Sequence, residues 1–150
     1  MKMNVTPEFI QETLGNKIVR FEKKNDRRFY IEIEAKDIIE CSRIFFKDIG
    51  MRFVIATAID TRHWFEILYH FSNDKTGTFY TFRVLLRDKV KPEIESITPL
   101  IRGAEWIERE MWELMGINFK NHPNLKRLLL AEDWPEGKYP LRIDSENVNK

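Results

Sequence analysis

The chain has 150 residues, of which 43% are apolar, and its 25 basic residues nearly balance its 24 acidic ones. This length and composition predict a folded chain with a sizeable core, not a disordered segment. The balanced charge argues against a dedicated nucleic-acid binder, which usually has a basic excess, so we expect no nucleic-acid partner.

The cysteine content and the hydropathy pattern bear on the compartment. Cys41 is the single cysteine, and it cannot form an internal disulfide or ligate an iron–sulfur cluster by itself. No segment approaches the roughly 20 apolar residues of a membrane-spanning helix, and residues Met1–Asn16 lack a signal-peptide pattern. We expect a cytoplasmic protein that other subunits would have to hold at any membrane.

The N-terminal third predicts one helix and two strands. Thr6-Pro7-Glu8 is typical of a helix start, with an N-cap, an N1 proline and an acidic first turn, and Gly15 would end that helix. Strands are predicted at Ile18–Glu22 and at Phe29–Glu34, where apolar and polar residues alternate, with a turn at Asn25-Asp26.

The middle of the chain predicts a helix followed by three strands. Apolar residues over Ala35–Ile49 form one helical stripe, and Gly50 is a suitable C-terminal stop. The strands are expected at Met51–Asp60, Trp64–Phe71 and Thr78–Arg87, the last two forming a hairpin through the turn residues 73–77.

The last third predicts helices and then an extended segment. Pro92 would open a short helix through Ile97 that Pro99 ends, and a strong helix follows over Gly103–Met115, ended by Gly116. The proline-rich remainder indicates an arm. We therefore predict an α+β fold, mostly an antiparallel sheet with helices packed on it, as a globular domain at 1–116 and a C-terminal arm at 117–150.

Patterns of catalytic residues are missing. The sequence has no glycine-rich phosphate loop, paired-cysteine motif, His-Glu-x-x-His or Gly-x-Ser-x-Gly. His63, His70 and His122 lie in separate segments, and Cys41 lies on an apolar helical stripe as an inert buried thiol would. We expect no catalytic, cofactor-binding or metal-binding residue. A stand-alone enzyme using Glu110 and His122 is one alternative, and a ligand-binding or assembly module is another.

The helix at 103–116 has more than one non-polar side. Ala104, Ile107, Met111, Leu114 and Met115 share one stripe about 100° wide, which should face the core of the domain. Trp106 and Trp112 lie well off this stripe, and a solvated helix does not usually place tryptophans there.

Charged residues occupy the rest of this helix. Glu108 and Glu110 flank the apolar stripe, and Arg109 lies on the far face with acids one turn to either side. The pattern favours burial on several sides, by another chain or by the C-terminal arm, over a solvated face with weak ion pairs. Because the arm cannot form a core of its own, it must lie along a surface of this chain or of a neighbour.

This same stretch resembles the complex I 30 kDa subunit family, also called the C subunit of NADH-quinone oxidoreductase. The resemblance covers roughly residues 100 to 142, whereas the first 90 residues agree only in the order of elements. Glu113 stands where aspartate is common in that family, Asn121 stands where glycine is common, and the chain is shorter than usual. The residues that carry the resemblance are Glu108-Arg109-Glu110, Glu113, Leu114-Met115, His122, Lys126 and Leu128-Leu129, with Gly103-Ala104-Glu105-Trp106, Trp134, Gly137 and Pro140-Leu141-Arg142 around them.

The resemblance implies an α+β subunit of a peripheral arm on the cytoplasmic side, without cofactors of its own. It would pack against a large hydrogenase-like, 49 kDa-type catalytic subunit and lie near a small iron–sulfur subunit, which connect it to membrane subunits. Iron–sulfur clusters, and in a hydrogenase a nickel–iron centre, would belong to those partners.

The parent complex is less sharply indicated. The run Tyr139-Pro140-Leu141-Arg142 is most similar to subunits of energy-converting membrane-bound hydrogenases and their sulfur-reducing relatives. A true NADH/quinone complex I is the alternative. The residues expected to contact partner subunits are Trp106, Glu108, Arg109, Glu110, Trp112, Glu113, His122, Lys126, Arg127, Trp134, Tyr139 and Arg142.

Overall fold

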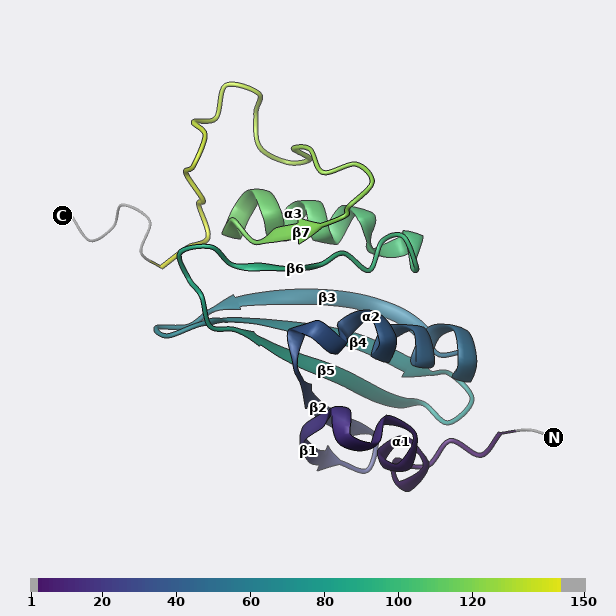
Figure 1. Ribbon diagram of the computed structural model, residues 1–150. Coiled ribbons are helices and arrows are strands. Elements are labelled where there is room, and N and C mark those ends of the chain that lie inside the picture. The colour runs from purple at the N-terminus through teal and green to yellow at the C-terminus, as the bar shows by residue number, and fades with distance from the viewer. Residues whose placement is uncertain (1–2, 144–150) are drawn as a thin grey trace.

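The fold is α+β, as predicted, and is built on a five-stranded sheet with strand order β1-β2-β5-β4-β3. The computed structural model describes residues 3–143 (Figure 1). Neighbouring strands of this sheet are antiparallel except β2 and β5, which are parallel. The elements are α1 (Pro7–Leu14), β1 (Ile18–Asn25), β2 (Arg28–Ile33), α2 (Ile38–Arg43), β3 (Arg52–Asp60), β4 (Phe65–Asn73), β5 (Thr78–Leu86), β6 (Glu93–Glu95), α3 (Glu105–Met115) and β7 (Asn118–Lys120).

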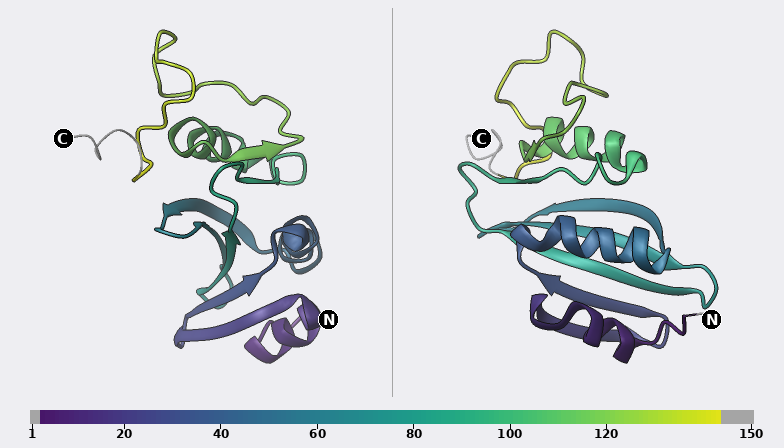
Figure 2. Two further views of the ribbon diagram at one scale, coloured as in Figure 1. Left: turned by 60° about the vertical axis from the view of Figure 1, so that its left-hand side comes forward. Right: turned by 45° about the vertical axis from the view of Figure 1, so that its right-hand side comes forward.

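Helices α1 and α2 cover the same face of the sheet (Figure 2). Their buried residues meet the alternating apolar side chains of β2, β4 and β5, which the period-2 pattern predicted to face the core. Phe45, which follows α2, packs against Phe71 and Phe82 with ring centroids 5.4 and 4.3 Å away. The core is therefore centred between α2 and the β4–β5 hairpin.

The ends of the first helices follow local sequence signals. Thr6 caps α1, its Oγ1 accepting a hydrogen bond from the Phe9 amide at 3.1 Å. The predicted helix at 35–49 is less regular than its pattern indicated, because a 3₁₀ turn precedes α2 and a π-helical turn, Ile44–Ile49, follows it. Gly50 ends this segment in the left-handed conformation (φ 80°).

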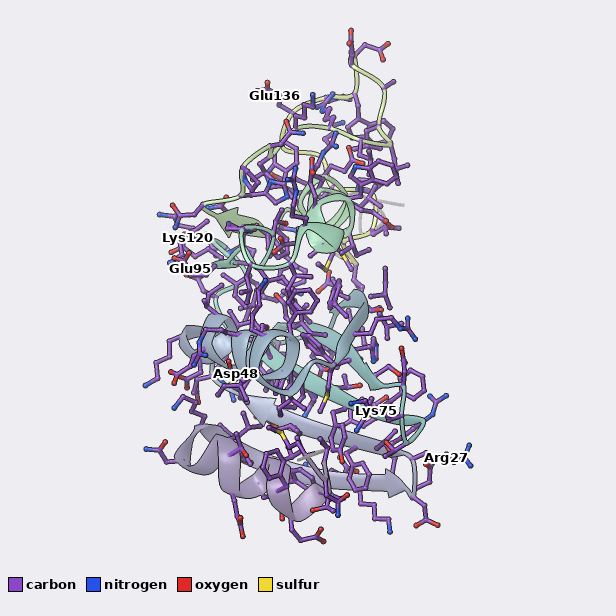
Figure 3. The ribbon with its side chains drawn as sticks, turned by 90° about the vertical axis from the view of Figure 1, so that its right-hand side faces the viewer. Arg27, Asp48, Lys75, Glu95, Lys120 and Glu136 are labelled. Carbon is purple, nitrogen blue, oxygen red and sulfur yellow. The ribbon has the colours of Figure 1, made fainter. Side chains whose placement is uncertain are left out.

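A second unit lies beyond the edge strand β3 (Figure 1). It consists of β6 and β7, which form a parallel pair, and of α3, which connects them. Lys120 and Glu95 approach across the pair, with Nζ 3.6 Å from Oε1 (Figure 3). The predicted helix at Pro92–Ile97 is therefore wrong, because β7 supplies a strand partner for Glu93–Glu95. For the same reason, the extended arm begins only after Lys120.

Among the helices of residues 3–143, none is long and apolar enough to cross a bilayer.

Candidate functional site

The site is built around α3, whose far side is crossed by the arm. We use "the arm" for its described part, residues 121–143, which loops over α3 and returns toward the edge of the sheet (Figures 1 and 2). Several side chains of α3 bond to main-chain groups of the arm. They belong to the segment that the sequence singled out.

Arg109 holds the first half of the arm. Its guanidinium is buried and donates from Nε to the carbonyl oxygen of Lys126 at 2.9 Å and from Nη2 to that of Arg127 at 2.7 Å. Glu105, one turn earlier, lies 3.9 Å away. The two bonds use the fork geometry of the guanidinium, so a lysine could not replace it in kind.

Glu113 holds the next residues of the arm. Its buried carboxylate accepts hydrogen bonds from the amides of Leu128 at 2.9 Å and Leu129 at 2.7 Å, with Leu130 at 3.4 Å. A carboxylate bound by consecutive amides is a charge-assisted arrangement. Arg109 and Glu113 together therefore hold residues 126–130 against α3 through main-chain groups.

Glu108 points the other way, toward β6. Its carboxylate accepts hydrogen bonds from the hydroxyl of Ser96 (2.7 Å), the amides of Ile97 and Thr98 (both 3.1 Å) and the hydroxyl of Thr98. Burial raises the pKa of Glu108, and these four donors oppose that rise without cancelling it. The residue thus fastens α3 to the segment that follows β6.

His122 and Asn124 join the start of the arm to the first turn of α3. The Nε2 of His122 lies 3.1 Å from the carbonyl oxygen of Glu105, while its Nδ1 accepts from the amide of Asn124 at 3.0 Å. This network assigns the proton to Nε2. Asn124 also donates to the carboxylate of Glu105 at 2.9 Å.

The last residues of the arm contact the C-terminal end of α3. Leu141 donates its amide to the carbonyl of Leu114 at 3.0 Å, and Nε of Arg142 donates to that of Met115 at 2.6 Å. The guanidinium of Arg142 lies over the rings of Tyr139 and Phe65, with centroids 4.7 and 5.2 Å away.

Gly116 is required for this contact. It ends α3 with φ 72°, and a Cβ at this position would lie 2.6 Å from Tyr139 Cε2 and 2.7 Å from Arg142 Nη2. A side chain would therefore meet both the left-handed backbone and the arm.

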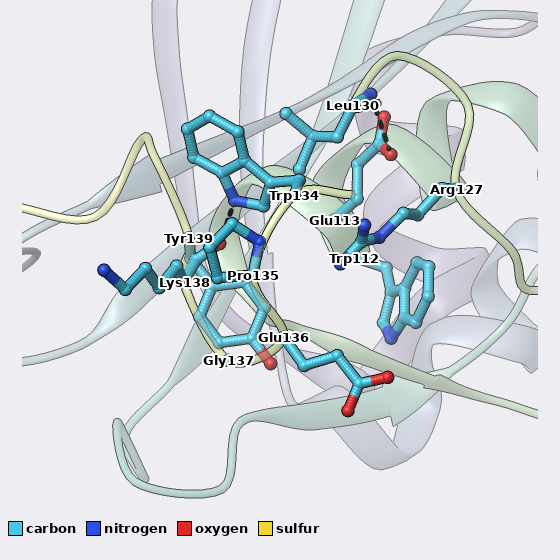
Figure 4. A pocket seen from close by; sticks show the side chains of 10 residues that line it. All are labelled: Trp112, Glu113, Arg127, Leu130, Trp134, Pro135, Glu136, Gly137, Lys138 and Tyr139. Atoms are coloured by element: carbon cyan, nitrogen blue, oxygen red, sulfur yellow. Dashed lines mark hydrogen bonds between the residues drawn. The ribbon is translucent and has the colours of Figure 1, made fainter. Parts of the chain in front are cut away.

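A pocket of about 280 Å³ lies beneath the outer loop of the arm (Figure 4). Trp112, Trp134 and Tyr139 line it, and the Nε1 of Trp134 donates to the carbonyl of Lys138 at 2.8 Å. Arg127 reaches the carbonyls of Ala131 and Glu132 at 2.9 and 3.0 Å. The aromatic residues of the arm thus shape its own loop.

The structure divides the twelve predicted interface residues between two settings. Ten belong to α3 or the arm where the two pack together or to the segment after β6: Glu108, Arg109, Trp112, Glu113, His122, Lys126, Arg127, Trp134, Tyr139 and Arg142. Trp106 and Glu110 lie on a side of α3 that the arm leaves open, with the Trp106 side chain 68% exposed. Whether any of the twelve contacts a partner stays a prediction.

Two residues that bond to Glu108 were missed. Ser96 and Thr98 were not singled out, because their segment was predicted to end a helix. An alternation of Ser96 and Thr98 with apolar neighbours, next to the Glu93–Glu95 alternation, was the available signal.

The chemistry of the site is that of binding. Within residues 3–143, no group of three or more His, Cys, Asp or Glu side chains is placed to hold a metal ion. His122 bonds through both ring nitrogens, whereas Glu110 lines a separate groove beside β3. The structure does not bring these two residues into a hydrogen-bonded pair.

Comparison with known proteins gives a consistent result. Residues 31–149 match the family model described as "Respiratory-chain NADH dehydrogenase, 30 Kd subunit". The C subunit of the NADH-quinone oxidoreductase of Citrifermentans bemidjiense is 31% identical over 118 residues, which cover 76% of this chain and 71% of that protein. The C/D subunit of the enzyme of Buchnera aphidicola subsp. Baizongia pistaciae is 36% identical over 80 residues, covering 53% of this chain and 13% of that protein.

Other curated relatives are also longer, and the chain spans less than half of their length. Among solved structures, a chain of the membrane-bound sulfane sulfur reductase, an archaeal respiratory membrane complex, has a TM-score of 0.82. It is 23% identical, and the match covers 94% of this chain and 84% of that one. At this identity the likeness supports the fold.

Proposed function

This chain belongs to the family of the respiratory-chain NADH dehydrogenase 30 kDa subunit, and we propose that it acts as a non-catalytic structural subunit. In this role it supports electron transfer between cofactors that other subunits of a complex I-related membrane oxidoreductase hold. The chain itself would carry no cofactor.

The observation that carries the proposal is how α3 uses its charges. Arg109 and Glu113 bind main-chain groups of the arm, and Glu108 binds those of the segment after β6. These are the side chains on which a reactive site would have to draw, and they are committed to holding backbone in place. A helix and arm fixed in this way form a rigid docking surface.

The proposed partners follow from the family. A large hydrogenase-like, 49 kDa-type catalytic subunit and a small iron–sulfur subunit would pack on this surface and would hold the clusters. The relative named C/D carries two subunit letters in one chain, which supports a direct neighbour relation with the large subunit. The chain would be peripheral, on the cytoplasmic side, and attached to the membrane through these partners.

For the parent complex we favour an energy-converting hydrogenase or sulfur reductase. The Tyr139–Arg142 run, which closes the arm onto α3, is the support for this choice. The names of the curated relatives favour the alternative, a respiratory complex I with NADH and quinone.

The proposal is tested by native purification of the tagged protein from membranes of its source, followed by mass spectrometry of the co-purifying chains. We expect a hydrogenase-like large subunit and a small iron–sulfur subunit in equal amounts. Nickel ligands in the large subunit would separate a hydrogenase from its quinone- or sulfur-reducing relatives. A lone monomer with activity of its own would support the stand-alone enzyme, and a lone inactive monomer would support the assembly or binding module.

A further inference from the structure

Helix α3 presents three sides, and two of them are covered within the chain. Ala104, Met111 and Met115 are buried in the core, and Arg109 and Glu113 are buried under the arm. At about 100° per residue, the remaining third of the helix surface carries Trp106, Ile107, Glu110 and Leu114.

This third side borders a groove along β3. The groove has a volume of about 310 Å³, and Ile55 and Thr57 line it from β3, opposite Ile107, Glu110 and Leu114. Its floor and walls are largely apolar, and the Ile55 side chain is 44% exposed. Strand β3 ends the sheet, so no further strand of the sheet covers this side.

Apolar side chains continue the surface on both flanks of the groove. Ile59, on the same strand, and Leu141 and Ile143, at the end of the arm, are all more than one-third exposed. Trp106 lies on the same side of α3 as Glu110, about 40° away around the helix. A solvent-exposed apolar surface of this kind is typical of a protein contact.

Glu110 is the charged residue within this groove. Of the four charged side chains between positions 108 and 113, Glu108, Arg109 and Glu113 bond to groups of the chain. Glu110, which is half-buried, has no hydrogen bond or ion pair with any of residues 3–143. None of the residues that line the groove is basic.

We infer that this groove is the seat of a partner subunit, which inserts an apolar segment carrying one arginine or lysine that pairs with Glu110. Covering the groove without a cation would leave a desolvated carboxylate, which is costly. A cation placed there would also lie near the face of Trp106, which favours positive charge. This inference rests on the proposed function and names the contact through which docking occurs.

A second copy of this chain fits less well. A two-fold contact centred on the groove would bring Glu110 of one copy toward Glu110 of the other, with no basic residue in either groove to offset them. The missing cation therefore has to come from a different chain.

The test uses the tagged full-length protein, produced in its source and purified from gently solubilised membranes. Glu110→Lys should lower the amount of co-purifying large and small subunits at least about tenfold, and Glu110→Gln should lower it less and weaken its dependence on salt. The matched control is Glu12→Lys, which alters an exposed glutamate on α1, at the opposite end of the molecule (Figure 1). It should leave co-purification unchanged.

A folding control and a footprint complete the test. Because Glu110 bonds to no described group, the isolated Glu110→Lys protein should melt close to the unmodified protein. Hydroxyl-radical oxidation of Trp106 should be several-fold slower in the complex than in the isolated chain.

The outcomes separate the inference from the proposed function. If Glu110→Lys retains the partner subunits as well as the unmodified protein does, or if Trp106 is oxidised equally fast in the complex, the inference is overturned. A dimer of the isolated chain that Glu110→Lys abolishes would assign the groove to a second copy instead. If the unmodified protein brings no redox subunit with it, the proposed function itself fails.

Discussion

At the scale of single residues, Glu108 couples the stability of the protein to pH. Its carboxyl group is fully buried, and its pKa lies above the ordinary value of 4.5, mainly because burial disfavours the charged form. A carboxyl whose pKa is raised on folding binds its proton more tightly in the folded state. Its stabilising contribution is therefore complete below about pH 4.5 and is lost as the pH rises through the folded pKa.

Glu108→Gln should remove this dependence. The free energy of unfolding of the unmodified protein, relative to that of the variant, should fall as the pH rises above 4.5. Urea unfolding of both proteins at a series of pH values measures this difference. Glu34→Gln, at an exposed site, is the control. A difference between the unmodified protein and Glu108→Gln that is constant over the series would contradict the prediction.

Arg109 should act on the arm more than on the core. Arg109→Ala leaves the carbonyls of Lys126 and Arg127 without their donors, at a cost of about 2 kcal/mol, or roughly thirtyfold in the opening of the arm. Trypsin cleaves after lysine and arginine, so limited proteolysis at these two residues reports the opening directly.

Cleavage after Lys24, which is exposed on β1, provides an internal reference in the same digest. Arg109→Lys should give an intermediate rate, because one ammonium group cannot reproduce the two directed bonds of the guanidinium. Unchanged cleavage at Lys126 and Arg127 in Arg109→Ala would show that the arm is held by other contacts.

At the scale of elements, the end of α3 shows how one backbone position serves two contacts. Gly116→Ala adds the strain of a left-handed backbone, about 1 kcal/mol, to an overlap with Tyr139 and Arg142. Gly50→Ala carries the strain alone, because a Cβ there meets nothing within 4 Å.

We expect Gly116→Ala to lower the free energy of unfolding by about 2–4 kcal/mol and Gly50→Ala by about 1 kcal/mol. Chemical denaturation of the two variants measures the difference, which isolates the contact of α3 with the arm. Equal losses at the two positions would mean that the arm shifts away without cost.

The elements that the sequence predicted well are those with local signals. The capped start of α1, the β4–β5 hairpin and the left-handed glycine after α3 depend on residues within a few positions of one another. Segment 92–97 was predicted wrongly because proline and glutamate favour a helix start locally, whereas its strand partner, β7, lies more than twenty residues later.

The same limit applies to the site. The positions of Trp106, Arg109 and Trp112 indicated that α3 is covered on more than one side. Burial under the arm and burial under a partner would produce the same pattern, so the sequence left both open. The structure assigns Arg109 and Glu113 to the arm, which leaves Trp106 and Glu110 for a partner.

At the scale of the whole molecule, the features proposed for docking gather at one end. The arm, α3 and the groove along β3 lie beyond one edge of the sheet, and α1 and β1 lie at the other (Figure 1). The end of the arm is also fixed to the sheet, since the amide of Ile143 donates to Asp60 at 2.8 Å. The arm therefore has a defined position relative to both α3 and β3.

A scaffold and a catalytic subunit respond differently to loss of this order. If the chain holds neighbouring subunits in place, Arg109→Ala should reduce the number of assembled complexes in the membrane several-fold, because a released arm must be ordered again on docking. Each complex that does assemble should turn over at the unmodified rate, since the electron-carrying centres would lie in other subunits.

Native gels of solubilised membranes would count the assembled complexes, and activity normalised to the large subunit would give the turnover of each. Glu12→Gln, on the exposed side of α1, should change neither quantity. If Arg109→Ala left the number of complexes unchanged and abolished their turnover, the residue would have to act on the chemical step. The scaffold role would then be wrong.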